Sequence, residues 1–325
     1  MDNGIEALKE KAIKQKGIDC DDAMRLYSAG LNRPFTLFAC ASEIMEFFKG
    51  KNISFCSIVN AKSGLCPEDC RFCAQSSYHR TEADVYPLLS ADELIKKAEI
   101  AKGQGASMFG IVTSGTQIDT EDEWETIEEA IKGINAIGIK PCGSLGMLDA
   151  SRAERLRDAG LFRYHHNLET ARSNFDNICT THRYDDDIET IRNAKKAGLT
   201  TCCGGIIGLG ETMAQRIEMA FTIKELDVDS VPVNILNPIK GTPLEDQPLL
   251  SPMEVLITLA IFRFILPDKD IKVCGGKEKN LRQLLPLAIV AGCNSLMTGN
   301  YLTTPGRNAE SDIEMIRDLG FYPGI

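Results

Sequence analysis

Short apolar runs rich in β-branched residues alternate with longer amphipathic segments along most of the chain. Eight of these runs have the length and composition of strands: 53–59, 107–113, 139–145, 162–168, 199–206, 230–236, 271–274 and 295–298. Helical patterns lie between them, at 91–103, 121–137, 188–198, 212–226, 252–266 and 279–291. Parallel strands need crossover helices, and an eighth strand can close the sheet on itself. The alternation therefore predicts an α/β fold, a (β/α)8 TIM-type barrel, in preference to an open doubly wound sheet.

The barrel pattern begins near residue 51 of the 325 residues. We expect residues 1–50 to form an N-terminal helical extension, in which Asp21 is the N-cap of a helix over 22–30. Residues 51–325 then form a single catalytic domain, because α/β barrels often exceed about 250 residues as one unit.

Cysteine is the outlier of the composition, with 12 residues against a single Trp. A disulfide scaffold is short and secreted, whereas this chain is long and its first residues lack the apolar core of a signal peptide. The longest apolar stretch, 255–266, contains Arg263 and is too short to span a bilayer. A net charge of −10 argues against nucleic-acid and membrane partners. We therefore expect a cytoplasmic protein whose thiols bind metal or take part in catalysis.

Three of the cysteines share one loop after the first strand. Cys66, Cys70 and Cys73 have the spacing CxxxCxxC, on a segment that Gly64 opens and Pro67 kinks. A structural zinc ion needs four ligands, and the nearest further candidate is His79. Three thiolates on one loop can instead hold three corners of a cubane iron–sulfur cluster. The spacing therefore predicts an iron–sulfur site at the carboxyl end of a barrel strand.

The loop resembles the signature of the radical SAM superfamily, CxxxCxφC, where φ is aromatic and is Phe72 here. The resemblance implies that Cys66, Cys70 and Cys73 bind a 4Fe–4S cluster whose fourth iron chelates S-adenosyl-L-methionine. Reductive cleavage of that cofactor would yield a 5′-deoxyadenosyl radical, which abstracts hydrogen from unactivated carbon. The cofactor supplies this chemistry and the barrel supplies orientation and shielding.

Six further segments together resemble the biotin synthase family, and the similarity extends from about Arg33 to the C-terminus. They are 60–64, 164–170, 204–212, 231–234, 240–244 and 299–307. The resemblance implies a sulfurtransferase that inserts sulfur into dethiobiotin to form biotin. It also implies a homodimer and a flavodoxin- or ferredoxin-type electron donor. Two alternatives remain at this point: another radical enzyme of similar architecture, of the hydrogenase-cluster maturase or mutase type, and an iron–sulfur electron carrier without a substrate.

Polar residues at the predicted carboxyl ends of strands are candidates for ligand binding, since barrel active sites are built there. Asn offers both a donor and an acceptor, which suits a urea group. By resemblance, Asn167 and Asn234 would hold the ureido ring of dethiobiotin and Glu169 the ribose of S-adenosyl-L-methionine. The remaining candidates are Gly204, Gly205, Glu211 and Arg183 for the cofactor, and His165 and Lys272 for the substrate.

The sequence departs from the family at a second cluster. Well-known biotin synthases hold a 2Fe–2S cluster with three cysteines and an arginine; Cys142 and Cys202 match two of these, but the others fall on Gly110 and Lys272. Cys56 and Cys274 can replace them, because Cys56, Cys142, Cys202 and Cys274 lie on the first, third, fifth and seventh predicted strands. Alternate strands fill one interior layer of a barrel. The parity predicts a rebuilt auxiliary iron–sulfur cluster, a four-iron one with or without an extra sulfide.

Other cysteines complete the expectations. Cys203 faces away from Cys202 unless the strand bulges, so we rank it as a reserve ligand, behind the other four cysteines. The alternative is that the auxiliary cluster is lost and that Cys56, Cys203 and Cys274 are core residues. We assign Cys20, Cys40, Cys179 and Cys293 to packing. The family arginine for the carboxylate of S-adenosyl-L-methionine falls on Asp187, and Arg183, one helical turn earlier, is the candidate substitute.

Overall fold

The computed structural model describes residues 3–304 and 306–324. Its strands are β1 (Asn52–Lys62), β2 (Met108–Thr113), β3 (Lys140–Ser144), β4 (Arg163–His165), β5 (Thr200–Cys202), β6 (Gly205–Ile207), β7 (Ser230–Ile235), β8 (Asp270–Val273), β9 (Ser295–Met297) and β10 (Tyr322–Gly324). All pairings are parallel, in the order β10-β1-β2-β3-β4-β5-β7-β8-β9, and β9 pairs with β1 to close the ring. The predicted (β/α)8 barrel is confirmed.

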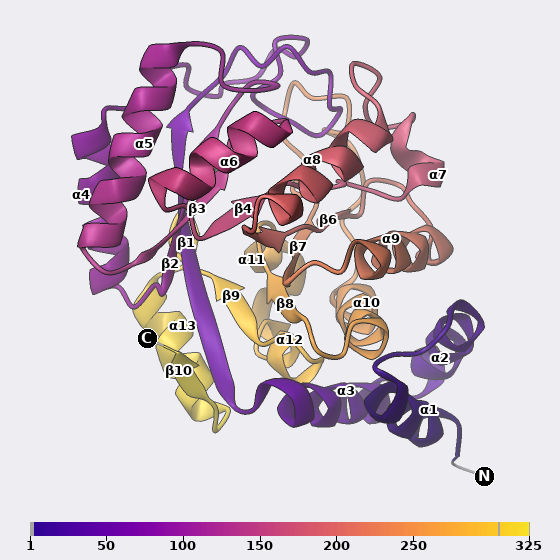
Figure 1. The fold of residues 1–325 in the computed structure, drawn as a ribbon. Coiled ribbons are helices and arrows are strands. Elements are labelled where there is room, and N and C mark those ends of the chain that lie inside the picture. Colours follow the sequence, from indigo (N-terminus) through magenta and orange to yellow (C-terminus); the bar gives the residue numbers. More distant parts are fainter. Residues whose placement is uncertain (1–2, 305, 325) are drawn as a thin grey trace.

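Helices cover the outside of the barrel (Figure 1). They are α1 (Asn3–Gln15), α2 (Cys20–Asn32), α3 (Pro34–Lys49), α4 (Ala91–Gly103), α5 (Glu121–Ala136), α6 (Ala150–Ala159), α7 (Arg172–Phe175), α8 (Tyr184–Lys196), α9 (Met213–Leu226), α10 (Pro252–Ile265), α11 (Lys277–Leu281), α12 (Leu287–Val290) and α13 (Ala309–Asp318), with a 3₁₀ turn η1 (Arg282–Leu284). Their apolar faces and the outward residues of the strands form the core. The helix α10 is buried almost throughout, because α3 and α9 pack on its outer side.

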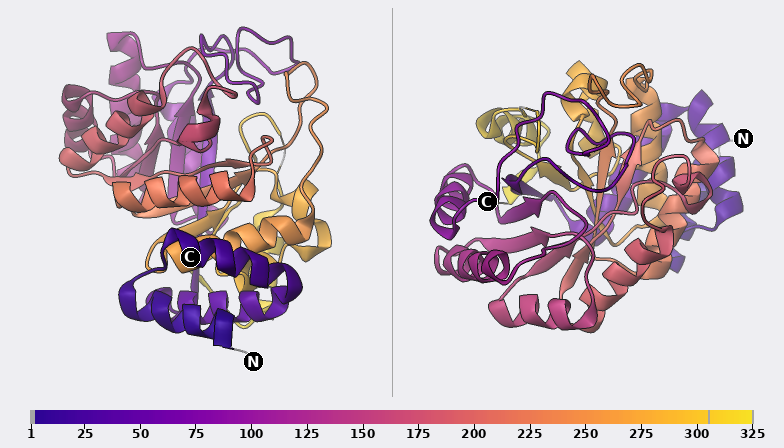
Figure 2. Two further views of the ribbon diagram at one scale, coloured as in Figure 1. Left: turned by 90° about the vertical axis from the view of Figure 1, so that its right-hand side faces the viewer. Right: turned by 90° about the horizontal axis from the view of Figure 1, so that it is seen from above.

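The two ends of the barrel differ in what covers them. Figures 1 and 2 show α1, α2 and α3 below the end where the strands begin, and the long loop between β1 and α4 above the end where the strands finish. In a barrel of this kind the carboxyl ends of the strands carry the active site. The cysteine loop therefore lies at the functional mouth.

Several predicted boundaries were wrong. The strand expected over 199–206 is two strands, β5 and β6, interrupted at Cys203 and Gly204, because Pro232 of β7, which faces this stretch, has no N–H to donate to the ladder. The helix expected over 279–291 is broken into α11, η1 and α12, because Arg282 has a left-handed φ of 52° and Pro286 cannot donate the next helical hydrogen bond. The N-cap of α2 is Asp19 and not Asp21, since Asp19 accepts from the Asp22 amide at 2.9 Å. The strand β10 was not predicted; it extends the sheet beside the start of β1.

Candidate active site

A mostly apolar cavity of about 320 Å³ opens at the carboxyl end of the barrel. Its walls carry a few polar groups and thiols, which is the usual make-up of a small-molecule site. The predicted site residues that line it are Cys56, Cys142, His165, Asn167, Glu169, Cys202, Asn234 and Lys272. The structure thus brings together eight candidates that the sequence distributes over more than 200 residues.

The loop with Cys66, Cys70 and Cys73 reaches this cavity through Phe72, which lines it. Short backbone bonds fold the loop on itself: the Cys73 amide donates to the Cys70 carbonyl at 2.9 Å, and the Cys66 amide donates to the Gln75 carbonyl at 3.0 Å. Burial, with the charge of Cys66, raises the pKa of Cys73 to about 11. The three thiols are half-buried, and the charges of neighbouring thiols in the loop influence one another's pKa. Sulfur is a soft donor, so the three thiols fit an iron–sulfur cluster.

Glu169 sits at the end of the fourth barrel unit with a left-handed backbone, φ 59°. Its carbonyl accepts from the Ile206 amide at 2.8 Å, and its carboxylate accepts from Asn167 Nδ2 at 3.3 Å. Burial, and then the charge of Asp187, raise the pKa of Glu169 to about 8. A non-glycine residue held in this conformation in a cavity wall is typical of functional sites.

The two asparagines are held by backbone donors. Asn167 Oδ1 accepts from the Gly204 amide at 3.2 Å, and Asn234 Oδ1 accepts from the Gly275 amide at 3.0 Å. Both side-chain oxygens accept a hydrogen bond, so a further partner would meet the NH₂ groups. The NH₂ group of Asn167 also donates to Glu169. His165 is neutral here, because burial and then the charges of Lys272 and Arg163 lower its pKa to about 3.

Four buried thiols gather deeper in the barrel. Cys56 on β1, Cys142 on β3 and Cys202 on β5 line the cavity. Cys274, immediately after β8, is fully buried, and its pKa is raised by burial and by the charges of Cys56 and Cys202. Cys56, Cys142 and Cys202 come from three separate strands and Cys274 from the end of a fourth. Their charges nevertheless influence one another, so the four thiols fit the interior layer that strand parity predicts.

Two buried cations accompany the thiols. Lys272 is 6% exposed and donates a hydrogen bond to Cys56. The charges of Cys56, Cys202 and Cys274 raise the pKa of Lys272 in spite of burial. Arg163, on β4, is also buried. Burial and the charge of Cys202 raise the pKa of Cys142 to about 12, and the charge of Arg163 opposes this rise. Buried cations are costly unless paired, so this layer is built to hold negative charge.

Four of the predicted cofactor residues do not reach the cavity. The Arg183 side chain is 82% exposed and pairs with Asp186 at 2.7 Å, so it points to solvent. It is therefore not directed to where the carboxylate of S-adenosyl-L-methionine was expected, inside the barrel. Glu211 is buried, where it accepts from the amides of Gly208 and Leu209 and pairs with Arg216 at 2.6 Å. The other two, Gly204 and Gly205, do not line the cavity either.

Gly204 and Gly205 serve the fold. A Cβ on Gly204 would lie 1.9 Å from the Pro232 carbonyl oxygen, and one on Gly205 would lie 2.6 Å from the Glu169 carbonyl oxygen. Glycine is therefore needed for close approach of the backbone to β7 and to the cavity wall. The reserve ligand Cys203 faces the core between barrel and helices, opposite to Cys202.

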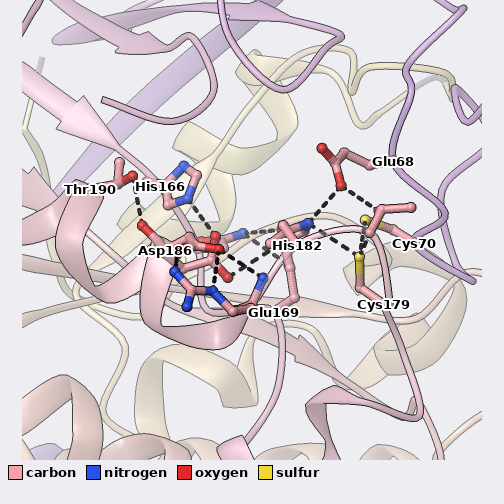
Figure 3. A network of polar contacts seen from close by, with 12 residues as sticks. Glu68, Cys70, His166, Glu169, Cys179, His182, Asp186 and Thr190 are labelled. Carbon is pink, nitrogen blue, oxygen red and sulfur yellow. Dashed lines mark hydrogen bonds and ion pairs between the residues drawn. The ribbon is translucent and has the colours of Figure 1, made fainter. Parts of the chain in front are cut away.

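Sequence reasoning missed a second set of residues, beside the cysteine loop (Figure 3). Cys179, which we assigned to packing, has its sulfur 3.8 Å from that of Cys70. His182 Nδ1 lies 2.7 Å from Glu68 Oε2, and His166 Nε2 lies 2.8 Å from Asp187 Oδ1. The only sequence signal was the density of His, Cys and acidic residues in 165–187. Of the four cysteines assigned to packing, Cys40, Cys179 and Cys293 are buried as expected, whereas Cys20 is exposed.

Solved structures of other proteins share this fold. Methylornithine synthase aligns with a TM-score of 0.83 at 20% identity and covers 97% of both chains. A maturase of FeFe-hydrogenase aligns with a TM-score of 0.83 at 18% identity, over 99% of this chain and 76% of its own. Identities this low show a shared fold alone, so neither activity passes to this chain.

The residues 62–223 match the family described as "Radical SAM superfamily", and 232–322 match the "Biotin and Thiamin Synthesis associated domain". The barrel, the cysteine loop at its mouth and these matches define a radical SAM enzyme. The biotin synthase of Geotalea uraniireducens is 52% identical over 98% of this chain and 97% of its own, and that of Carboxydothermus hydrogenoformans is 50% identical over 98% and 99%. The chain belongs to the biotin synthase family.

No helix among the described residues is both long and apolar enough to cross a membrane.

Proposed function

We propose that the protein converts dethiobiotin to biotin in the cavity at the barrel mouth. The proposal is carried by one cavity, whose wall includes Cys56, Cys142 and Cys202 from the barrel strands and Phe72 from the loop that bears Cys66, Cys70 and Cys73. The loop cluster with S-adenosyl-L-methionine, when bound, supplies a 5′-deoxyadenosyl radical that takes hydrogen from carbon. The barrel walls exclude water from that step.

The polar residues of the cavity have distinct roles in this proposal. Asn234 and Asn167 present amide groups to the ureido ring of dethiobiotin, which carries both donors and acceptors. Glu169 accepts the ribose hydroxyls of S-adenosyl-L-methionine, and its left-handed backbone fixes where its carboxyl group stands. His165 and Lys272 face the substrate side of the cavity, His165 as a neutral hydrogen-bonding group and Lys272 as a charge.

The barrel thiols Cys56, Cys142, Cys202 and Cys274 bind, in our proposal, a rebuilt auxiliary cluster that donates the sulfur. Four thiol donors suit a four-iron cluster, with or without an extra sulfide, better than a two-iron cluster without its arginine. Lys272 and Arg163 support this assignment, because buried cations beside the thiols offset the negative charge of a cluster. Gly110 on β2 offers no ligand atom, and a Cβ there would already lie 3.0 Å from the side chain of Ile58 on the neighbouring strand β1.

An anaerobic incubation with reductant, S-adenosyl-L-methionine and dethiobiotin tests the proposal, with biotin and 5′-deoxyadenosine read by mass spectrometry. Cys70→Ala is expected to lose both products. Cys142→Ala is expected to keep 5′-deoxyadenosine and lose biotin, because only the sulfur source is damaged. Cys293→Ala, which removes a buried thiol away from the cavity, is the matched control and keeps both. Formation of 5′-deoxyadenosine without biotin in the wild type would contradict sulfur insertion.

Iron analysis with Mössbauer spectroscopy tests the auxiliary cluster separately. We expect about eight irons per chain, four for each cubane, and a drop to about four in Cys142→Ala. About four irons in the wild type would show that the barrel thiols are core residues and that the auxiliary cluster is lost.

We also propose, from the family, a homodimer that receives electrons from a flavodoxin- or ferredoxin-type donor. In this proposal it works in the cytoplasm, and the twelve free thiols support a reducing compartment. Residues 1–50 form, in this proposal, a helical extension of a single catalytic domain at 51–325. Light scattering of the purified holoenzyme at a series of concentrations checks the dimer, and a monomer mass throughout would exclude it.

A further inference from the structure

A second cavity lies beside the substrate cavity, between α4 and α13. Its volume is about 1080 Å³, and residues of both helices line it next to β1. Ile100, which is 55% exposed, and the exposed Glu310 are among these residues, so the second cavity opens to solvent. The residues that line both cavities are Ser57, Ile58, Tyr301 and Leu302. At these positions the wall between the two cavities is therefore a single residue thick.

One part of this wall is a strand and the other is a turn. The strand part, residues 57 and 58, belongs to β1 and pairs with β2. The turn part is the segment 301–304, which follows β9, and all four of its residues line the substrate cavity. Among the described residues, its only backbone–backbone hydrogen bond is internal, from the Tyr301 amide to the Thr304 carbonyl at 3.0 Å. This 301–304 turn can therefore move without breaking the sheet.

Side chains fasten the 301–304 turn to the barrel. Lys277 Nζ donates to Tyr301 Oη at 2.7 Å, and Tyr301 Oη donates to Glu278 Oε1 at 2.8 Å. Lys277 is fully buried and pairs with Glu278 at 3.2 Å. On the other side, Asn60 Nδ2 donates to the Leu302 carbonyl at 3.1 Å. Hydrogen bonds to charged groups are stronger than neutral ones, so the Tyr301 hydroxyl group is the main fastening of the turn.

The other way into the substrate cavity is the barrel mouth, which the cluster loop covers. That loop is bonded to the turn at 178–181: the Arg71 amide donates to the Ile178 carbonyl at 3.0 Å, and the Thr180 amide donates to Asp69 Oδ1 at 2.8 Å. In the proposed function, S-adenosyl-L-methionine binds at this loop and the sulfur source lies deeper, so dethiobiotin occupies the space between them. A bound cofactor then blocks the mouth for the substrate.

We propose that the 301–304 turn is a gate between the two cavities, through which dethiobiotin enters and biotin leaves. Lys277 and Glu278 are positioning residues that hold this gate shut through Tyr301. Sulfur replaces two C–H bonds of dethiobiotin, so the cofactor has to be renewed once while the intermediate stays bound. A separate gate permits this, because the cofactor exchanges at the mouth. The inference rests on the proposed function in taking dethiobiotin as the substrate.

The test measures how fast dethiobiotin enters and leaves. Anaerobic holoenzyme is mixed with S-adenosyl-L-methionine and ¹⁴C-labelled dethiobiotin without reductant, so that the substrate binds but does not react. Rapid filtration gives the association rate constant, and a chase with unlabelled dethiobiotin gives the dissociation rate constant. Tyr301→Phe keeps the ring in the wall and removes only the hydroxyl group. Both rate constants are expected to rise by about tenfold, as for the loss of a hydrogen bond to a charged group, while their ratio changes far less.

A second variant obstructs the route from outside. Ile100 lines the second cavity and not the substrate cavity, so Ile100→Trp narrows the route without touching the bound substrate. Both rate constants are expected to fall, with the Kd unchanged. The matched control is Leu31→Trp, which enlarges a 57% exposed side chain of α2 at the opposite end of the barrel. It is expected to leave both rate constants as in the wild type.

The outcomes separate the gate from its alternatives. A rise in the dissociation rate constant alone in Tyr301→Phe would show that the hydroxyl group contacts the substrate, and it would overturn the inference. Wild-type rate constants in Ile100→Trp would overturn it as well. A wild type that does not bind dethiobiotin would contradict both the gate and the proposed function. Binding without biotin formation under reducing conditions would contradict sulfur insertion alone, since the rate constants of the variants still decide the gate.

Discussion

At the scale of single residues, Glu169 shows how the barrel changes the chemistry of a side chain. Its backbone is left-handed and its carboxyl group faces the cavity wall, where Asn167 donates to it. Burial disfavours the charged form, and the charge of Asp187 adds to this, so the pKa rises to about 8 from the ordinary value of 4.5. In the free protein the group is therefore largely neutral at pH 7.

This shift makes a prediction for stability against pH. A pKa raised in the folded state means that the contribution of Glu169 is complete below about pH 4.5 and is lost as the pH rises through 8. Glu169→Gln cannot ionise, so its Tm is expected to match the wild type at pH 4.5 and to exceed it by several degrees at pH 8. Thermal unfolding of the cluster-free proteins measures this. The exposed Glu129→Gln is the control, and a difference independent of pH would contradict the assigned shift.

At the scale of elements, the segment between β5 and β6 requires a glycine at position 204, where its backbone lies close to β7. A Cβ on Gly204 would lie 1.9 Å from the Pro232 carbonyl oxygen, so the backbone of one strand would have to move. Gly204→Ala is expected to lower the free energy of unfolding by about 3 kcal/mol, at the upper end of the usual range for single substitutions. Urea unfolding checks this. Gly103→Ala, where nothing lies within 4 Å, is expected to be neutral or stabilising.

A second element depends on a buried arginine. Arg263 of α10 is 0% exposed and donates to the carbonyls of Gly292, Pro267 and Lys269 and to Asn294 Oδ1, which fastens the helix to the turns before β8 and β9. Arg263→Met is expected to cost about 3–5 kcal/mol of stability, because buried carbonyls lose their donor. Calorimetry measures the loss against Arg192→Met, which removes an exposed guanidinium. A loss no larger than that of the control would show that water replaces the donor.

At the scale of the whole molecule, the cluster loop connects distant parts of the barrel. Its backbone bonds include one from the Ser77 amide to the Cys66 carbonyl at 2.8 Å and one from the Ser63 amide to the Tyr86 carbonyl at 3.1 Å. Three bonds to iron would cross-link this segment. Removing the iron is therefore expected to speed amide exchange at residues 64–86 and to leave α1–α3 unchanged. Hydrogen-exchange mass spectrometry of holo and stripped protein checks this, and equal rates at 64–86 would contradict it.

Sequence patterns predicted the parts of this protein that depend on neighbours in the chain. The alternation of strand and helix predicted the barrel. Its parity predicted one interior layer of Cys56, Cys142, Cys202 and Cys274, of which the first three line the cavity, because side-chain direction in a strand follows its two-residue period. The spacing of Cys66, Cys70 and Cys73 predicted a metal loop, since ligands close in sequence need no tertiary information to converge.

Contacts between distant segments were decided by the tertiary structure alone. Arg183 lies one turn from Asp187, yet it points to solvent as the first residue before α8, whereas Asp187 turns inward to His166. Cys179 reads as one more apolar residue in the sequence, and only the packing of the turn at 178–182 on the loop brings it to Cys70. Local periodicity fixes which face a residue is on, but which partner it meets there depends on how whole elements dock, and no spacing within the chain records that.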